Sequence, residues 1–355
     1  MIVDGHLDLA YGVLGYGRDL QHLSALEVRE LERQKIAAGL ITPAQAERGL
    51  CMCTLSELER GKTAIVFGTL YASPAVSWIH PGERHPGGYD TPEEANAQGL
   101  AQLAVYEGWE RAGRIRIIKS KTDLEHHLEL WNIDGVTGLV VLMEGADPIM
   151  TPDDLDNWWK RGVRIVGTSW GPTRYAGGTG TPTGLTDIGR ELIAAMKDQH
   201  MILDASHQSH EAFWDSMDVG VHRVIASHSN SYSINPTSNR HITDEMINAI
   251  GQRNGRIGIV LFNRFLEQHW SRETPDYPVT LDGQVKNHLT HMASLIGWDK
   301  VCIGSDIDGG LGRDETPTGL EFHGDIVKIG DVVPAHARDG VLGQNWISFL
   351  NEALP

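Results

Sequence analysis

Histidine and carboxylate residues follow several short apolar runs of the sequence, and these two residue types together can bind divalent metal ions. His6 and Asp8 lie two residues apart at the end of the first run, so on an extended chain their side chains point the same way. Imidazole and carboxylate groups are common ligands of zinc-like ions. The other candidates, each at the end of a later apolar run, are Glu144, His207, His228 and Asp306.

The order of these residues assigns each of them a role in a site with two ions. A pair of ions about 3.5–4 Å apart needs a bridging carboxylate, and Glu144 is the acid that ends a central run. His6 and Asp8 would hold the first ion, and His207 and His228 the second. Asp306 would lie near the first ion, take a proton from the metal-activated water and pass it to a leaving amine. Singly each residue has an ordinary structural explanation, but their joint placement favours the metal site.

Short apolar runs, separated by helical patterns, must position these groups. Continuous apolar runs are typical of parallel strands that are covered on their outer face. Repeated strand-then-helix units predict a (β/α)8 barrel, with a doubly wound sheet as the other possibility, and all C-terminal strand ends of a barrel meet on one face. The predicted strands are 2–5, 64–70, 138–143, 163–168, 201–204, 224–226, 257–261 and 301–304, with a short ninth run at 115–118 outside the barrel.

Local signals mark helix starts and loops within this pattern. Thr91 and Thr151 each precede a proline and two acids, and Thr243 precedes Asp-Glu, so all three are predicted helix N-caps. The Gly/Pro-rich segments 72–90 and 171–184 are too long for ordinary turns, and we predict that they are lids over the active-site face. Because no repeat or linker interrupts the pattern, residues 1–355 are expected to form one domain.

Composition excludes several kinds of protein. The 355 residues are 41% hydrophobic and 22% charged, as expected for a globular chain with a sizeable core. The formal net charge of −17, without a cluster of basic residues, disfavours a nucleic-acid partner. Cys51, Cys53 and Cys302 are too few for a disulfide framework or a zinc ribbon. The start of the chain has no signal-peptide pattern and no run is apolar enough to span a membrane, so we expect a cytoplasmic protein without a membrane anchor.

Several segments together resemble the membrane dipeptidase (renal dipeptidase) family, which is peptidase family M19 of the amidohydrolase superfamily. The segment 239–244 is similar to the family's arginine-containing loop, and 287–291 is similar to its helix before the last strand. The resemblance runs from residue 3 to about residue 345. The motifs that carry it, in the family's order and spacing, are 4–8, 143–146, 204–207, 227–229 and 303–309.

The resemblance implies a zinc-dependent dipeptidase that often tolerates a D-residue at the C-terminal position. It implies two zinc ions held by the metal ligands named above, with Glu144 shared, and a dipeptide as the small-molecule substrate. It also implies that Arg240 binds the substrate carboxylate, a task suited to a planar guanidinium. The family's acid–base aspartate maps most simply to Asp306, with Asp308 as the second candidate. Relatives are often dimers, so a homodimer is expected.

The sequence departs from the family at the end of the fourth strand. Trp170 stands where the family has a histidine that contacts substrate and helps to stabilise the oxyanion. An indole has one N–H donor and no charge, so it can replace the hydrogen bond but not proton transfer. Arg174 nearby is an alternative source of positive charge. The departure leaves the metal ligands intact and makes Trp170 a candidate substrate-binding residue.

Two other functions therefore stay open beside dipeptide hydrolysis. A related amidohydrolase would act on another amide or ester, such as an N-acyl amino acid or a lactone. A protein that binds metal with little turnover is the second alternative. Lys119 could bridge metals as a carbamate, but Glu144 makes this unnecessary. The glycines at 15–17 and 177–180 lack the context of a dinucleotide site, and no G-x-S-x-G motif of a serine hydrolase is present.

Overall fold

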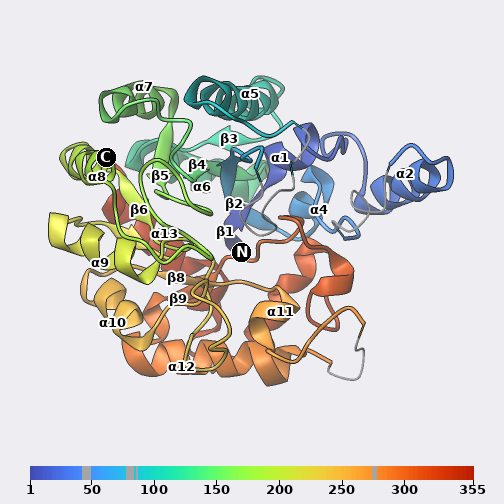
Figure 1. Cartoon of the computed structure of the whole chain (residues 1–355). Helices are drawn as coiled ribbons and strands as arrows, with labels where there is room; N and C mark the ends of the chain where they lie inside the picture. The colour runs from blue at the N-terminus through green and yellow to red at the C-terminus, as the bar shows by residue number, and fades with distance from the viewer. Residues whose placement is uncertain (42–48, 77–83, 85–86, 274–277) are drawn as a thin grey trace.

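Parallel strands form the centre of the computed structural model, which describes residues 1–41, 49–76, 84, 87–273 and 278–355 (Figure 1). The order around the sheet is β7-β6-β5-β4-β2-β1-β9-β8, and all of these pairs are parallel. A bridge between Ala226 and Ile257 joins the two ends of this order, so the strands make a nearly closed (β/α)8 barrel. The strands are β1 (Ile2–Leu7), β2 (Thr63–Tyr71), β3 (Arg116–Ile117), β4 (Gly138–Glu144), β5 (Val163–Val166), β6 (Ile202–Asp204), β7 (Val224–Ile225), β8 (Ile257–Ile259) and β9 (Val301–Ile303).

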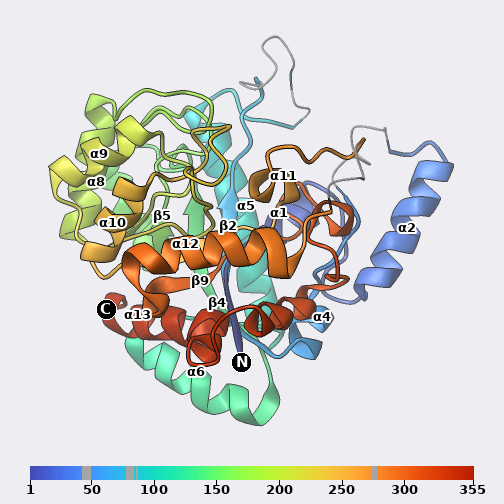
Figure 2. The same ribbon diagram turned by 90° about the horizontal axis from the view of Figure 1, so that it is seen from below.

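Helices surround the strands, and Figure 2 shows α2 projecting away from the body of the molecule. Among the described residues, no helix combines the length and the apolar composition needed to cross a bilayer. The helices are α1 (Leu9–Leu14), α2 (Ala25–Ala37), α4 (Leu55–Arg60), α5 (Pro92–Arg111), α6 (Lys121–Asp134), α7 (Leu155–Arg161), α8 (Asp187–Asp198), α9 (His210–Val219), α10 (Asp244–Gln252), α11 (Asn263–Leu266), α12 (Lys286–Ile296) and α13 (Asn345–Ala353).

The predicted barrel is confirmed, with shifts of a few residues at the strand ends. The ninth run is β3, which pairs only with β4 and lies off the barrel path. Thr91 and Thr243 cap α5 and α10 as predicted, and Thr91 forms a reciprocal capping box with Glu94. Thr151 also stands at an N-cap position, but the turn that it begins is a short 3₁₀ turn before α7, and its side chain makes no capping hydrogen bond.

The barrel is narrow beside Ser227, which follows β7. A Cβ atom added to Gly5, Gly258 or Gly304 would lie 2.9, 2.1 or 1.7 Å from the Ser227 carbonyl oxygen. Such distances are far below van der Waals contact, so only glycine fits at these positions of β1, β8 and the end of β9. The three neighbouring segments therefore fix the backbone of Ser227 tightly.

Candidate active site

The six predicted metal-site residues come together at the C-terminal end of the barrel. His6 lies within β1 and Glu144 is the last residue of β4. The others follow their strands directly: Asp8 after β1, His207 after β6, His228 after β7 and Asp306 after β9. The histidines and Glu144 are buried, whereas Asp8 and Asp306 are partly exposed toward the mouth.

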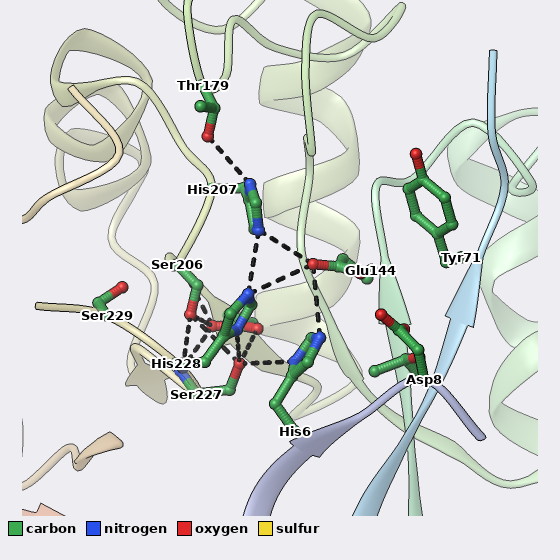
Figure 3. Close-up of polar contacts among 12 residues, drawn as sticks. His6, Asp8, Tyr71, Glu144, Thr179, Ser206, His207, Ser227, His228 and Ser229 are labelled. Carbon is green, nitrogen blue, oxygen red and sulfur yellow. Dashed lines mark hydrogen bonds and ion pairs between the residues drawn. The ribbon is translucent and has the colours of Figure 1, made fainter. Parts of the chain in front are cut away.

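The Glu144 carboxylate is the centre of the histidine cluster (Figure 3). Its Oε1 atom lies 3.5 Å from Nε2 of His6, 3.0 Å from Nε2 of His207 and 3.4 Å from Nε2 of His228. Three nitrogens thus point at one carboxylate oxygen from three different strands. This is the arrangement expected of ligands that share a cation.

The potential ligand atoms divide into two overlapping groups. His6, Glu144 and His228 form one group, and His6, Asp8 and Asp306 form the other, with the ligand atoms of each group lying within 4.8 Å of one another. Because the two groups share His6 and lie side by side, their geometry is compatible with two adjacent ions. Both groups combine imidazole with carboxylate, the ligand chemistry of zinc-like metals.

The Ser227 hydroxyl orients two of the histidines. Its Oγ donates to Oδ2 of Asp204 at 2.5 Å, so it can only accept hydrogen bonds from Nδ1 of His6 at 3.2 Å and Nδ1 of His228 at 2.8 Å. A hydroxyl has one hydrogen and two lone pairs, so these contacts use all of its capacity. In both histidines Ser227 thus contacts Nδ1, and Nε2 is the ring nitrogen directed at the site, where a metal ion would bind.

Two further observations show that the residues fit metal ions. Nε2 of His6 is buried and has no hydrogen-bond partner among the described residues, so a cation would satisfy it. A Cβ atom added to Gly309 would lie 2.1 Å from Oδ1 of Asp306 and 2.7 Å from Oδ2 of Asp8. Glycine at this position therefore keeps open the space between the two carboxylates.

The electrostatics of the cluster favour positive charge at its centre. Burial opposes protonation of His6, but Glu144, Asp8 and Asp306 raise its pKa to about 10. Burial acts against ionisation of Glu144, yet His6, His207 and His228 hold the pKa of this carboxyl well below its usual range. Burial, followed by the Arg240 charge, lowers the pKa of His207 to about 4. An ionised Glu144 beside a neutral His207 is the protonation pattern that a metal site requires.

Asp306 and Asp308 have different environments, and these separate the two candidates for the acid–base residue. Burial, together with the charges of Asp8 and Glu144, raises the pKa of Asp306 well above its usual range. Asp308 instead accepts hydrogen bonds from the backbone N–H groups of Met52 at 3.0 Å and Cys53 at 2.9 Å. Asp308 therefore holds a neighbouring segment in place, and Asp306 is the carboxylate that joins the ligand groups.

Arg240 is buried on the β6–β7 side of the site. Its Nη1 donates to the Ser206 carbonyl at 2.8 Å, and its Nη2 donates to the His228 carbonyl at 2.7 Å. These contacts tie together the two strand ends that carry His207 and His228. The Nε–H group of the same guanidinium has no partner among the described residues, so this edge can still bind an anion.

Trp170 and Arg174 occupy different places at the rim. The Trp170 ring lies 5.9 Å from the His207 ring, between centroids, and is partly exposed. Arg174 donates from Nε to Asp147 and from Nη2 to the carbonyls of Asp147 and Ile149. The alternative that Arg174 supplies the missing positive charge is therefore not supported, because its guanidinium binds this loop. The Lys119 side chain packs beside Gly162, which precedes β5, at the opposite end of the strands.

The two predicted lid segments have different contacts near the site. Thr179, in the segment 171–184, has its Oγ1 2.9 Å from Nδ1 of His207. In the segment 72–90, residues 77–83 and 85–86 lie outside the described residues. Tyr89, which is described, donates its hydroxyl hydrogen to Asp147.

The polar residues that support the ligands were not predicted from the sequence. Asp204 accepts from the Ser206 and Ser227 hydroxyls, and Asp4 accepts from the Ser305 hydroxyl. Thr69 donates its hydroxyl hydrogen to Asp8. Asp4 and Asp204 lie in the recognised motifs, each two or three residues before a ligand, but Ser227 and Ser305 are distant in the sequence.

A sequence comparison decides the family. The sequence pattern of membrane dipeptidases, peptidase family M19, matches residues 1–342. The chain belongs to this family. It is therefore a metal-dependent hydrolase of the membrane dipeptidase family.

Individual members of the family differ considerably from this chain. An uncharacterized protein in the pqqA 5′ region of Klebsiella pneumoniae is 29% identical over 269 residues, which cover 71% of this chain and 92% of that protein. The crystal structure of dipeptidase AC, at 23% identity, has a TM-score of 0.76 and covers 99% of this chain and 98% of its own. A Rhodobacter sphaeroides metallopeptidase, liganded with a phosphinate mimic of the dipeptide L-Ala-D-Ala, is 23% identical and has a TM-score of 0.77. The match covers 100% of this chain and 99% of that chain. The two structures share the fold of this membrane dipeptidase family member.

Proposed function

We propose that the protein hydrolyses dipeptides, including L,D-dipeptides, with two divalent ions, most simply zinc. The observation that carries the proposal is the pair of overlapping ligand groups beside a buried guanidinium whose Nε has no partner among the described residues. Ions at this place would activate water and polarise the scissile carbonyl. The Rhodobacter sphaeroides relative, which is liganded with a mimic of L-Ala-D-Ala, supports a D-residue at the C-terminal position.

Each residue of the site has its own role in the proposed reaction. Glu144 and the three histidines would hold the ions, and Asp8 and Asp306 would complete the first ion's ligands. Asp306 would receive the proton of the attacking water and deliver it to the departing amine. The Nε–H group of Arg240 would bind the substrate's terminal carboxylate, which in a dipeptide lies one residue beyond the scissile bond.

Trp170 is consistent with one alternative function, the hydrolysis of N-acyl amino acids. An N-acyl amino acid also ends in a free carboxylate next to an amide, so Arg240 would bind it equally well. An indole in place of the family's histidine changes the chemistry beside His207, and this favours a substrate other than an ordinary dipeptide. The two substrates differ in the charged ammonium group at the other end.

One experiment tests the proposal and the alternative together. We would measure metal content per chain and kcat/KM against L,L- and L,D-dipeptides, their C-terminal amides and their N-acetyl forms. Close to two divalent ions, with hydrolysis of the free dipeptides alone, would support the proposal. Preferred hydrolysis of the N-acetyl forms would favour the alternative, and full metal content without turnover of any compound would indicate a metal-binding protein.

A further inference from the structure

A continuous row of aromatic rings lines one side of the barrel mouth. The centroid of Tyr11 lies 5.2 Å from that of Tyr16 and 5.0 Å from that of Tyr71. Tyr71 in turn lies 5.1 Å from Trp170, which lies 5.9 Å from His207. Aromatic rings that pack edge to face at such distances attract each other. We call Tyr11, Tyr71 and Trp170, with Tyr16 at the outer end, the aromatic wall.

The aromatic wall reaches directly to the metal ligands. Tyr71 ends β2 and pairs in register with Glu144 at the end of β4, so its ring stands beside the central carboxylate. Trp170 follows β5 and contacts the His207 ring. Each ring of the wall is partly exposed rather than buried, as expected for side chains that border a binding pocket.

Arg240 lies across the mouth from this wall. Its guanidinium contacts Ser206, His228 and Ser229, which follow β6 and β7. Figure 3 shows Tyr71 and Ser229 on opposite sides of the histidine cluster. The aromatic wall therefore lies on the β2 and β5 side of the ligand groups, and the buried Arg240 guanidinium lies on their β6 and β7 side.

A pocket continues the aromatic side beyond Trp170. It is a small hollow whose lining includes Ala72, Pro74, Tyr89, Trp170 and Pro172. Asp147 accepts hydrogen bonds from the Tyr89 hydroxyl and from the Arg174 guanidinium beside it. One carboxylate thus fixes residues of both long loops that border the pocket.

We propose that the aromatic wall binds the side chain of the N-terminal residue of the dipeptide and selects large aromatic or apolar side chains there. The inference rests on the proposed function. A dipeptide whose carboxylate binds Arg240 and whose scissile carbonyl lies over the ligand groups must extend its N-terminal residue toward β2 and β5. An aromatic ring placed there gains contact area with the rings of Tyr71 and Trp170.

A dipeptide series with one variable end tests the proposal. We would measure kcat/KM of the metal-loaded protein for Ala-Ala, Leu-Ala, Phe-Ala and Trp-Ala, and for the reversed compound Ala-Phe. We expect Phe-Ala to exceed Ala-Ala by about 10-fold or more, since differences in apolar contact of this kind are worth roughly 10–200-fold. Ala-Phe should show no such gain.

Substitutions in the wall identify the residues responsible. Trp170→Leu and Tyr71→Leu should each reduce the Phe-Ala to Ala-Ala ratio by about 10-fold. Tyr71→Phe keeps the ring and should keep the ratio, which separates ring contact from a role of the hydroxyl. Trp214→Leu is the matched control, because Trp214 lies exposed on α9 and is no part of the mouth. Metal content of every variant is measured alongside.

The outcomes separate this proposal from the function on which it rests. Turnover of the whole series at equal rates, or a preference for Ala-Phe, would overturn the aromatic subsite and leave dipeptide hydrolysis standing. A ratio that Trp170→Leu and Tyr71→Leu leave unchanged, with full metal content, would also overturn it. Failure to hydrolyse any member would overturn the proposed function itself.

Discussion

Nε2 of His207 lies 3.0 Å from Nε2 of His228, and both rings are buried. Two nitrogen lone pairs at this distance repel each other unless a proton or a cation lies between them. Nδ1 of His228 already uses its hydrogen toward Ser227, so its Nε2 is bare. Glu144 lies within 3.4 Å of both nitrogens and supplies the negative charge that a shared cation needs.

Replacement of Glu144 should remove both ions. Glu144→Ala deletes a carboxylate that lies within 3.5 Å of Nε2 of all three histidines, whereas Asp8→Ala leaves those three contacts in place. We expect close to zero ions per chain for Glu144→Ala and about one for Asp8→Ala, measured by mass spectrometry of metals after desalting. Full metal content in Glu144→Ala would show that this carboxylate is not a shared ligand.

The two aspartates after β9 should respond differently to the same substitution. Asp306→Asn should lower kcat by about 10²-fold or more while leaving the fold intact, because a general acid–base group is lost. Asp308→Asn should mainly lower the melting temperature, since its carboxylate accepts from the Met52 and Cys53 N–H groups. Steady-state kinetics and thermal unfolding of both variants distinguish the roles. An inactive but fully stable Asp308→Asn variant would reverse the assignment.

Arg240→Lys should raise KM for dipeptides clearly. Lysine keeps the charge but loses the planar arrangement that contacts the Ser206 and His228 carbonyls and leaves Nε free. For the wild-type protein, C-terminal amides of the same dipeptides should be poor substrates. Kinetics on free and amidated pairs provide the measurement. Equal turnover of both forms by the wild type would mean that no carboxylate is recognised.

Trp170→His should raise kcat for dipeptides with a small N-terminal residue. The substitution restores a donor beside His207, and loss of one such oxyanion donor typically costs roughly 10²–10³ in rate. The gain should be accompanied by weaker selection of aromatic N-terminal residues. The dipeptide series described above measures both effects. If no member of the series is hydrolysed faster, the missing histidine does not limit turnover in this protein.

His241 should make the protein less stable in acid. The ring is buried against Phe265, and burial, followed by the Arg240 charge, lowers its pKa from 6.5 to about 3. The unfolded chain therefore binds a proton near pH 6.5 that the folded chain does not, so the unfolding free energy falls as the pH decreases from about 6.5 toward 3. The contribution of this histidine is up to about 1.4 kcal/mol per pH unit.

His241→Phe isolates this contribution. Neither ring nitrogen has a hydrogen-bond partner among the described residues, so phenylalanine leaves no donor or acceptor of the surroundings unpaired. Denaturant unfolding between pH 4 and pH 7 should show a shallower pH dependence than in the wild type. His126→Phe on α6 is the control for a histidine lost from the surface. Parallel curves for wild type and His241→Phe would contradict the assignment.

The clustering of the six candidate metal ligands could be predicted from the sequence because a barrel brings every C-terminal strand end to one face. His6 and His228 are far apart in the chain, but each follows or ends an apolar run, and this local signal was enough. Trp170 was placed at the mouth by the same rule. Family resemblance added Arg240, whose position in a loop gives no local signal.

The supporting contacts could not be predicted, because they depend on packing between distant segments. Asp4 and Ser305 lie 301 positions apart, and His6 and Ser227 lie 221 apart, so only the closed barrel reveals that they touch. Thr151 begins a 3₁₀ turn, so the α-helix itself starts only at Leu155, which the sequence pattern did not indicate. The sequence suggested Arg174 as a source of positive charge at the site. Its guanidinium instead donates to the backbone carbonyls of Asp147, Ile149 and Met150.

The glycines around Ser227 limit how this protein can change. Gly5, Gly258 and Gly304 leave no room for a methyl group against the Ser227 carbonyl, and the hydroxyl of the same residue serves both His6 and His228. A designer who enlarged the barrel at these glycines would therefore shift a shared support of two ligands at once. Tyr71 lies on the other side of the histidine cluster and is held by a different pair of strands, β2 and β4. Engineering of new specificity should begin with side chains on that side, away from the support that His6 and His228 share.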